Sequence, residues 1–348
     1  MTTAPAGIPE QVLLAWPKFA QLIWHPVTSG LINKTFRLEN PQGITIAIVQ
    51  RLHVIFEGTV NLDIDAVTRH LENKGMNTPR LIPTDKGKLW IEAEGAVWRS
   101  LTFIPGLTFE KVIDQQMAFE AGKLAGRFHR GLEDFEYAYR SPFRDVHNTA
   151  VHLNVLKKAL IQHDSHPLYG EVTHAAGLLF LATERLPNLH NLPSRHGHGD
   201  LKISNLRFNQ QRQGYCLIDL DTLGQMRWPF EMGDALRSWC NPNKEDEGDT
   251  SLNLDLFDGA LGGYASVDVS VTGQERESLV DGLIQICLEL SARFLSDTLN
   301  ESYFAWDPTR YPSHGAHNLS RAQAMWNLHK SVKKQRLEAE RIINTHFG

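Results

Sequence analysis

The chain has 348 residues, of which 42% are hydrophobic and 22% charged, and its formal net charge at pH 7 is −5. This composition is typical of a folded globular protein, and without a domain-wide basic excess it excludes a protein that binds nucleic acid through charge. Residues 1–9 carry neither a basic nor an apolar signal region, and no run of about 18 apolar residues occurs. We therefore expect no signal peptide, no membrane span and a cytoplasmic location.

The three cysteines, Cys216, Cys240 and Cys287, lack the spacing of a disulfide framework and are interpreted as reduced. His196 and His198 have no cysteine or histidine partners at zinc-ligand spacing. A structural zinc site is therefore a poor interpretation of this sequence.

The first part of the chain predicts a small α+β lobe. Apolar and β-branched residues predict four strands and one helix, with the strands over 32–38, 44–52, 88–93 and 96–104 and the helix over 63–74. Ile104-Pro105-Gly106 ends the strand pattern, so we place a boundary there.

From the boundary onward the sequence is mainly helical. Helical spacing of apolar residues predicts helices over 117–135, 151–162, 171–186, 279–299 and 321–343. We therefore predict an α+β, bilobal protein, with residues 1–104 as a small, mostly β N-lobe containing one helix and residues 105–348 as a larger, mainly helical C-lobe.

The most informative segment is His196-Gly-His-Gly-Asp-Leu-Lys-Ile-Ser-Asn205, which is followed by Ile218-Asp-Leu-Asp-Thr222. The intervening residues predict a hairpin, with strands at 206–208 and 215–218 that would return Asp219 to the side of Asn205. Phosphoryl transfer needs one carboxylate that accepts the proton of the attacking hydroxyl, and an amide and a second carboxylate that hold magnesium on the phosphates. The spacing is typical of that chemistry.

These residues receive separate roles. Asp200 is the candidate base, Asn205 and Asp219 are the candidate metal ligands, and Lys202 would face the phosphates unless it is a surface lysine. We expect His198 to brace the loop. Asp221 shares a side of the backbone with Asp219 and is left open between a residue that supports the site residues, a substrate contact, a metal contact and a purely structural role.

The N-terminal lobe offers candidates for nucleotide binding. The turn containing Gly30, Asn33 and Lys34 would let backbone and side chains approach phosphates. The lysine that a protein kinase carries on the following strand is missing, and either Gln50 or Arg51 would replace it. The adenine is expected against the segment Thr102, Phe103 and Ile104.

The His-Gly-Asp-x-x-x-x-Asn loop and the Ile-Asp-x-Asp strand end resemble those of the aminoglycoside phosphotransferase and choline kinase superfamily, which has the protein-kinase-like fold. The sequence is most similar to the N-acetylhexosamine 1-kinase branch. That likeness rests on these segments: 30–36, 50–52, 218–222, 232–237, 293–297, 302–304 and 317–322. The resemblance implies phosphorylation of the anomeric hydroxyl of an N-acetylated hexosamine, with Mg²⁺ and ATP, while GTP stays possible as the donor.

The acceptor is the least determined part of the prediction. Arg237, Tyr303 and Arg321 are candidate substrate contacts, and for the two arginines an ion pair that braces the lobe is an equal alternative. Choline, homoserine or an aminoglycoside remain alternative acceptors. A nucleotide-binding regulatory protein without turnover is the competing class of function, because the strand lysine is missing.

Overall fold

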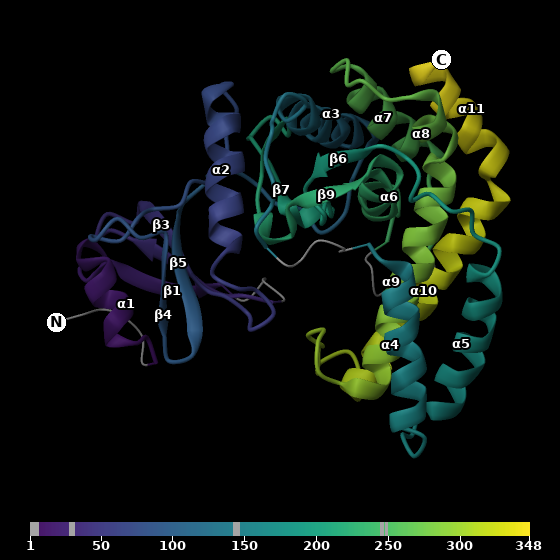
Figure 1. Ribbon diagram of the computed structural model, residues 1–348, viewed down its shortest axis with the longest axis horizontal. Helices are drawn as coiled ribbons and strands as arrows, with labels where there is room; N and C mark the ends of the chain where they lie inside the picture. Colours follow the sequence, from purple (N-terminus) through teal and green to yellow (C-terminus); the bar gives the residue numbers. More distant parts are fainter. Residues whose placement is uncertain (1–6, 28–31, 142–146, 244–246, 248–249) are drawn as a thin grey trace. The chain divides into compact units, whose positions relative to one another are not determined.

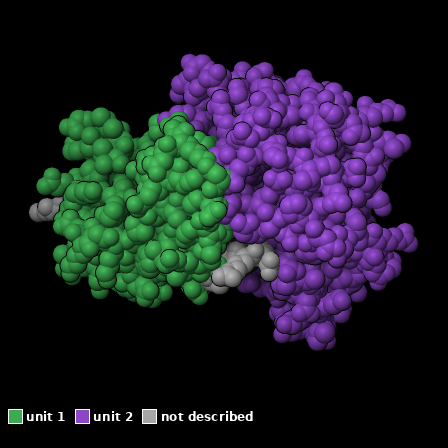
Figure 2. Space-filling model, turned by 45° about the horizontal axis from the view of Figure 1, so that its top comes forward, with its two compact units in different colours: residues 1–105, 134–144, 216–223 green, residues 106–133, 145–215, 224–348 purple. Residues whose placement is uncertain are grey.

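The structure is a computed structural model that describes residues 7–27, 32–141, 147–243, 247 and 250–348. The chain divides into two compact units that are discontinuous along the sequence (Figure 2). Unit 1 comprises residues 1–105, 134–144 and 216–223, and unit 2 comprises residues 106–133, 145–215 and 224–348.

Unit 1 contains a five-stranded antiparallel sheet with the order β1-β2-β3-β5-β4 (Figure 1). The strands are β1 (Ile23–Val27), β2 (Lys34–Glu39), β3 (Thr45–Arg51), β4 (Trp90–Ala93) and β5 (Ala96–Thr102). Strands β2 to β5 match the four predicted strands, whereas β1 was not predicted. Because β5 pairs with β3 in the sheet, Gln50 lies opposite Arg99.

One face of this sheet holds the hydrophobic core of unit 1. Trp24, Leu38, Val49 and Trp98 are buried there and pack with residues of α1 (Glu10–Ala15) and of the short 3₁₀ helix η1 (Pro17–Phe19). Successive strand residues point to opposite faces, so the neighbours of Val49 and Trp98 point away from this core. Those neighbours are Gln50 and Arg99.

The longer helix of unit 1, α2 (Val60–Asn73), explains why residues 134–144 belong to this unit. Asp63 on α2 is fully buried and accepts hydrogen bonds from the Tyr137 hydroxyl at 2.8 Å and from the backbone N–H groups of Arg140 and Ser141 at 2.9 and 2.8 Å. Burial and the adjacent Asp63 carboxylate raise the pKa of Tyr137 to about 12. A buried carboxylate is stable here because three donors satisfy it.

Unit 2 is mainly helical. Its helices are α3 (Gln115–Gly131), α4 (Thr149–Gln162), α5 (Tyr169–Thr183), α6 (Trp228–Trp239), α7 (Leu254–Ala265), α8 (Gly273–Glu277), α9 (Leu279–Asn300), α10 (His314–Lys334) and α11 (Arg336–Phe347). The single helix predicted over 321–343 is two helices, with a break at Gln335, where the backbone leaves helical geometry (φ −100°, ψ 10°). Helices α6, α7 and α8 were not predicted.

Helix α9 is the central element of unit 2, because nearly all of its residues are buried and it packs against α4, α5, α6 and α10. Glycine allows α6 and α9 to approach closely, since a Cβ on Gly282 would lie 2.2 Å from the carbonyl oxygen of Pro229. The residues of α6 and α9 that flank this crossing are therefore brought near one another.

Two short two-stranded sheets flank the segments of chemical interest. Strand β6 (Ser194–Gly197) pairs with β9 (Gly224–Arg227), and β7 (Leu206–Phe208) pairs with β8 (Gly214–Leu217) as predicted. A small unit built on an antiparallel sheet and a larger helical unit confirm the α+β class. In the described part of the chain, every helix is too short or too polar to cross a membrane.

Candidate active site

The loop after β6 brings three of the predicted site residues together in unit 2. Lys202 Nζ donates to Asp200 Oδ2 at 2.7 Å. The side-chain amide of Asn205 donates to both the backbone carbonyl and Oδ2 of Asp200, at 2.9 Å each. Asn205 ends the 3₁₀ turn η2 (Ile203–Asn205), which folds it back onto Asp200. The predicted loop therefore closes around a single carboxylate.

Charge keeps that carboxylate ionised. Burial alone would raise the pKa of Asp200, but Lys202, with smaller contributions from Arg237 and His198, lowers it to about 2. The side chain remains 25% exposed, so a small molecule can reach it. Asp200 is thus an accessible anion under all ordinary conditions.

A buried glutamate that was not predicted as a site residue binds the backbone of this loop. Glu231 on α6 accepts hydrogen bonds from the backbone N–H groups of His198 at 2.7 Å and Gly199 at 2.9 Å. Its Oε1 also lies 3.2 Å from His129 Nε2. Burial would raise the pKa of Glu231, but His129 and these donors lower it overall. His198 Nδ1 in turn accepts the backbone N–H of Asp200 at 3.3 Å, so this histidine takes part in bracing the loop, as the sequence suggested.

The same helix makes two further contacts with the loop. Ser238 Oγ accepts from the backbone N–H of Ile203 at 3.0 Å, and Trp239 Nε1 donates to the carbonyl of Leu201 at 2.7 Å. These bonds satisfy backbone groups that regular secondary structure does not reach. Helix α6 therefore acts as the platform on which the loop is built.

The second acidic segment belongs to unit 1. Asp219 follows β8 and precedes the 3₁₀ turn η3 (Leu220–Thr222), and its backbone is left-handed, with φ 64° and ψ 58°. A non-glycine residue in that region costs on the order of 1–3 kcal/mol, which the surrounding structure must offset. Such residues are frequent at functional sites.

Asp221 is 3% exposed and bound on both carboxylate oxygens within unit 1. Arg99 on β5 donates to Oδ1 through Nη1 and to Oδ2 through Nη2, the latter at 3.0 Å. Asn33 Nδ2 donates to Oδ2 at 2.7 Å. Of the roles left open for Asp221, these contacts favour a structural one, because they join separate segments of unit 1.

The predicted replacements for the strand lysine lie side by side on β3 but differ in their contacts. Gln50 Oε1 accepts from Nε and Nη2 of Arg99 at 2.9 and 2.7 Å. Arg51 is partly exposed at the end of β3, in register with Lys34 of β2. The strand therefore carries a neutral amide bonded to a buried guanidinium, with two further cations close to its end.

Other residues predicted to contact nucleotide are placed as follows. Asn33 uses its amide oxygen to accept the backbone N–H of His53 at 2.9 Å. Thr102 ends β5 and accepts the backbone N–H of Arg80 through its hydroxyl at 2.9 Å. Phe103 and Ile104 follow directly in the chain. Gly30 lies outside the described residues.

Arg237, a predicted acceptor contact, is buried on α6. Its Nε and Nη2 donate to Asp234 Oδ1 at 3.0 and 2.9 Å. This is the ion pair that was weighed against substrate binding. The positive charge of Arg237 also acts on Asp200 and helps to lower its pKa.

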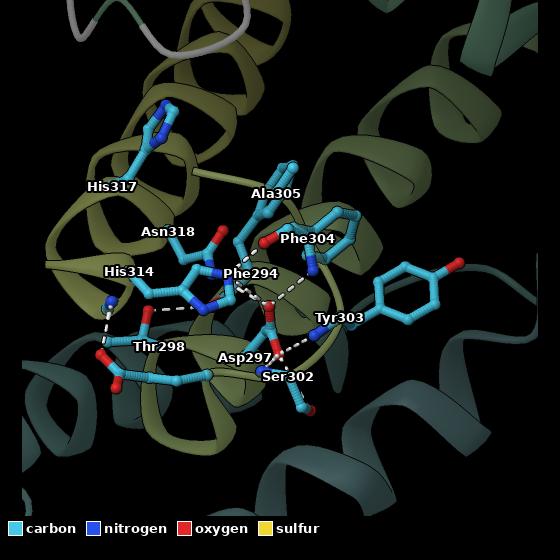
Figure 3. Close-up of polar contacts among 12 residues, drawn as sticks. Phe294, Asp297, Thr298, Ser302, Tyr303, Phe304, Ala305, His314, His317 and Asn318 are labelled. Carbon is cyan, nitrogen blue, oxygen red and sulfur yellow. Dashed lines mark hydrogen bonds and ion pairs between the residues drawn. The ribbon is translucent and has the colours of Figure 1, made fainter. Parts of the chain in front are cut away.

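Tyr303 lies beside a buried carboxylate, Asp297, which Asn318 also contacts (Figure 3). The backbone N–H groups of Ser302 and Tyr303 donate to its Oδ1 at 3.0 and 2.9 Å, and Asn318 Nδ2 donates to its Oδ2 at 3.0 Å. Arg321 donates to the carbonyl of Ala305 at 2.8 Å and to Asn318 Oδ1 at 3.1 Å. The contacts observed for Tyr303 and Arg321 stabilise the loop between α9 and α10.

The residues that fit a metal ion are oxygen donors. Because the Asn205 amide nitrogen faces Asp200, its carbonyl oxygen is the end suited to a cation, and Asp219 offers a carboxylate. Mg²⁺ prefers such hard oxygens and takes its other ligands from water and phosphates. The described residues contain no cluster of three or more His, Cys, Asp or Glu side chains arranged for a metal.

Sequence reasoning missed Arg99, Glu231 and Asp234. Glu231 and Asp234 had a usable signal, since acids three residues apart on a helix share a face and both are buried here. Arg99 had little signal, because one arginine within a strand says nothing about a partner far along the chain.

The chain is similar to known proteins in both sequence and fold. A model of the APH phosphotransferase enzyme family matches residues 23–268. The homoserine kinase of Burkholderia cenocepacia is 24% identical over 333 residues, covering 93% of this chain and 90% of that protein.

Two solved structures are similar in fold over nearly their whole length. An amicoumacin kinase, in a complex with AMP-PNP, Ca²⁺ and Ami, has a TM-score of 0.62 at 16% identity and covers 94% of this chain and 92% of that one. A microcompartment-associated aminopropanol kinase has a TM-score of 0.58 at 13% identity and covers 95% and 97%. The fold is therefore kinase-like. Since the family model spans most of the chain, the protein belongs to the APH phosphotransferase enzyme family, as a small-molecule kinase whose acceptor is an alcohol.

Proposed function

We propose that this kinase transfers the terminal phosphate of ATP to a hydroxyl group whose proton Asp200 accepts. The observation that carries the proposal is that Lys202 and Asn205 both donate to the same oxygen of Asp200, Oδ2. The second oxygen, Oδ1, is then directed to the incoming hydroxyl. Because the pKa of Asp200 is held at about 2, the carboxylate is anionic when the acceptor binds and can orient the hydroxyl by accepting its hydrogen bond.

In this proposal Asn205 and Asp219 are the ligands of Mg²⁺, which when bound neutralises charge on the transferring phosphoryl group. Lys34 and Arg51, in register on β2 and β3, are the candidate cations for the nucleotide phosphates. The segment 102–104 would contact the adenine. Residues 1–104 would thus supply nucleotide binding, and residues 105–348 the base and the acceptor site.

For the acceptor we propose the 1-hydroxyl of an N-acetylhexosamine. The support is the sequence resemblance to that kinase branch, which includes segments 232–237 on α6, 293–297 on α9 and 317–322 on α10. A neutral sugar is held by several directional hydrogen bonds. Arg237, whose charge lowers the pKa of Asp200, and its ion-pair partner Asp234 are the residues of α6 that would provide them.

A second acceptor class, an amino alcohol such as homoserine, is favoured by one buried polar atom. Asp234 Oδ2 has no hydrogen-bond partner among the described residues. Asp234 lies one helical turn beyond Glu231, which binds the catalytic loop, so its carboxylate is on the side of α6 that faces the loop. A buried carboxylate oxygen requires a donor, and an ammonium group would satisfy it. The likeness to a homoserine kinase agrees with this class.

Release of ADP from Mg·ATP across a panel of acceptors tests these alternatives. The panel contains N-acetylglucosamine, N-acetylgalactosamine, homoserine, choline, an aminopropanol and an aminoglycoside, and Asp200→Asn serves as the inactive control. We expect turnover on the N-acetylhexosamines, with a product whose phosphorus signal couples to the anomeric proton. Turnover on homoserine alone would replace the sugar proposal by the amino-alcohol one. Nucleotide binding without turnover on any acceptor would indicate a regulatory protein instead.

A further inference from the structure

The buried guanidinium of Arg99 lies at the place in the sheet where a strand lysine is missing. Arg99 is 1% exposed and stands opposite Gln50 in the β3–β5 register. Few arginines are buried to this degree without a charged partner, because removing the cation from water is costly. The contacts of the Arg99 guanidinium therefore indicate the role of its positive charge.

Those contacts join several segments of unit 1. The guanidinium binds both carboxylate oxygens of Asp221, in the bidentate geometry that arginine favours. It also donates to Gln50 on β3 and, at 3.4 Å, to Asn61 Oδ1 on α2. Asn33, at the start of β2, completes the network by donating to Asp221 at 2.7 Å.

The carboxylate held in this way lies two residues after Asp219. The backbone between them is the tight turn η3, and Asp219 itself is in the left-handed region. An unfavourable backbone conformation persists only where its neighbours are fixed. Anchoring Asp221 on both oxygens supplies that constraint two residues after Asp219.

We propose that Arg99 is a positioning residue, which acts through Asp221 to hold Asp219 in the orientation needed to bind the metal–nucleotide complex. The proposal rests on the metal role given to Asp219 in the proposed function. It also accounts for the neutral Gln50 on β3, because the cation of this sheet comes from β5 and Gln50 serves as its hydrogen-bond acceptor. Arg99 touches neither substrate nor nucleotide in this proposal.

The test compares binding of Mg·AMP-PNP with binding of AMP-PNP in EDTA, by isothermal titration calorimetry, and records Tm for each variant. Arg99→Met should weaken Mg·AMP-PNP binding about ten- to a hundredfold, the cost of a charge-assisted hydrogen bond, and leave binding in EDTA within about threefold. Arg99→Lys keeps the charge but loses the bidentate geometry, so it should lie between Met and wild type. Arg37→Met, on β2 of the same sheet and 43% exposed, is the matched control and should bind as wild type does.

Arg99→Met alone leaves the Asp221 charge buried and uncompensated, so loss of stability has to be separated from loss of positioning. The double variant Arg99→Met/Asp221→Leu removes both charges, and replacing a buried ion pair by apolar residues is often neutral for stability. We expect it to recover Tm and to keep the weakened Mg·AMP-PNP binding. Recovery of binding together with Tm would overturn the proposal.

Asp219→Ala separates this inference from the proposed function. If Asp219→Ala binds Mg·AMP-PNP as wild type does, the metal role of Asp219 is wrong. If Asp219→Ala weakens binding but the double variant does not, the metal role stands and the positioning role of Arg99 is wrong.

Discussion

Glu231 accepts the backbone N–H of Gly199 at 2.9 Å, and Gly199 holds a positive φ of 79° directly before the candidate base. The glycine permits the turn, and the buried glutamate fixes it by accepting the N–H groups of two successive residues, His198 and Gly199. The direction of the Asp200 side chain is therefore set by a residue on α6 that makes no contact with a reacting atom in the proposed mechanism.

Glu231→Gln should lower kcat about ten- to a hundredfold, because the amide presents only one acceptor to two N–H groups and a charge-assisted hydrogen bond contributes about 1.5–3 kcal/mol. Steady-state kinetics on the best acceptor measures this change. Glu338→Gln, on the exposed face of α11, is the control and should leave kcat unaltered. An unaltered kcat in Glu231→Gln would show that the loop does not need this support.

Asp200→Asn should abolish most turnover while nucleotide affinity stays near that of wild type. The substitution preserves the shape of the side chain but removes the proton acceptor, and a general base contributes a factor of about 10²–10⁴. The rate of ADP release and the Kd for Mg·ATP are measured on the same preparation. Asp255→Asn, on the first turn of α7, controls for a change of charge. A wild-type kcat with an intact fold would remove Asp200 from the mechanism.

The local part of this site follows from the sequence, because Asp200, Lys202 and Asn205 lie within six positions and a short hairpin follows. The supports of the site come from elsewhere in the chain. Arg99 and Asp221 are 122 positions apart, and no periodicity in either segment indicates that they meet. Only the packing of the folded unit brings them together.

The predicted helices and strands also divide into those that a local sequence pattern indicates and those that it does not. Alternating and helical apolar patterns predicted β2 to β5 and most long helices, because those patterns reflect burial on one face. Helix α6 was missed although Glu231, Asp234 and Arg237 recur in it at three-residue steps, which is the spacing of one helix face. The break between α10 and α11 at Gln335 has no glycine or proline to mark it.

Asp219→Ala and Asn205→Ala should weaken Mg·ATP binding and turnover together, because a metal ligand acts on the phosphates both before and during transfer. Titration calorimetry with Mg·ATP, repeated without metal, measures the metal-dependent part. We expect the difference between the two titrations to shrink in both variants. Wild-type affinity and activity in both would exclude them as metal ligands.

Lys202→Met should move the acid limb of the kcat/KM profile to higher pH. Burial raises the pKa of Asp200, and Lys202 is the largest of the charges that lower it. Without the lysine the burial effect is less opposed, so the carboxylate takes up a proton at a higher pH and loses its function as a base there. Profiles of kcat/KM from pH 4 to 8 are measured for wild type, for Lys202→Met and for Lys202→Arg, which keeps the charge. Coincident acid limbs in Lys202→Met and Lys202→Arg would contradict this control of Asp200.

His329 gives the fold a sensitivity to acid that is separate from the site. The side chain lies on α10 with 4% exposure, its ring centroid is 4.9 Å from that of Trp326, and burial lowers its pKa from the ordinary 6.5 to about 4. Above pH 6.5 the residue is neutral in both the folded and the unfolded chain. As the pH falls from 6.5 toward 4, the unfolded chain takes up a proton that the folded chain does not, so the free energy of unfolding decreases.

His329→Leu should therefore lose less stability than wild type between pH 7 and pH 4.5. The shift corresponds to a maximum effect on the order of 3 kcal/mol at the acid end, since one pKa unit is about 1.4 kcal/mol. Urea denaturation at each pH measures the free energy of unfolding, and comparing each variant with itself at pH 7 removes the effect of the altered packing. His174→Leu, on the exposed face of α5, is the matched control and should follow the wild-type pH dependence. If the free energy of unfolding of His329→Leu changed with pH as steeply as that of wild type, His329 would be protonated in the folded protein as readily as in the unfolded chain.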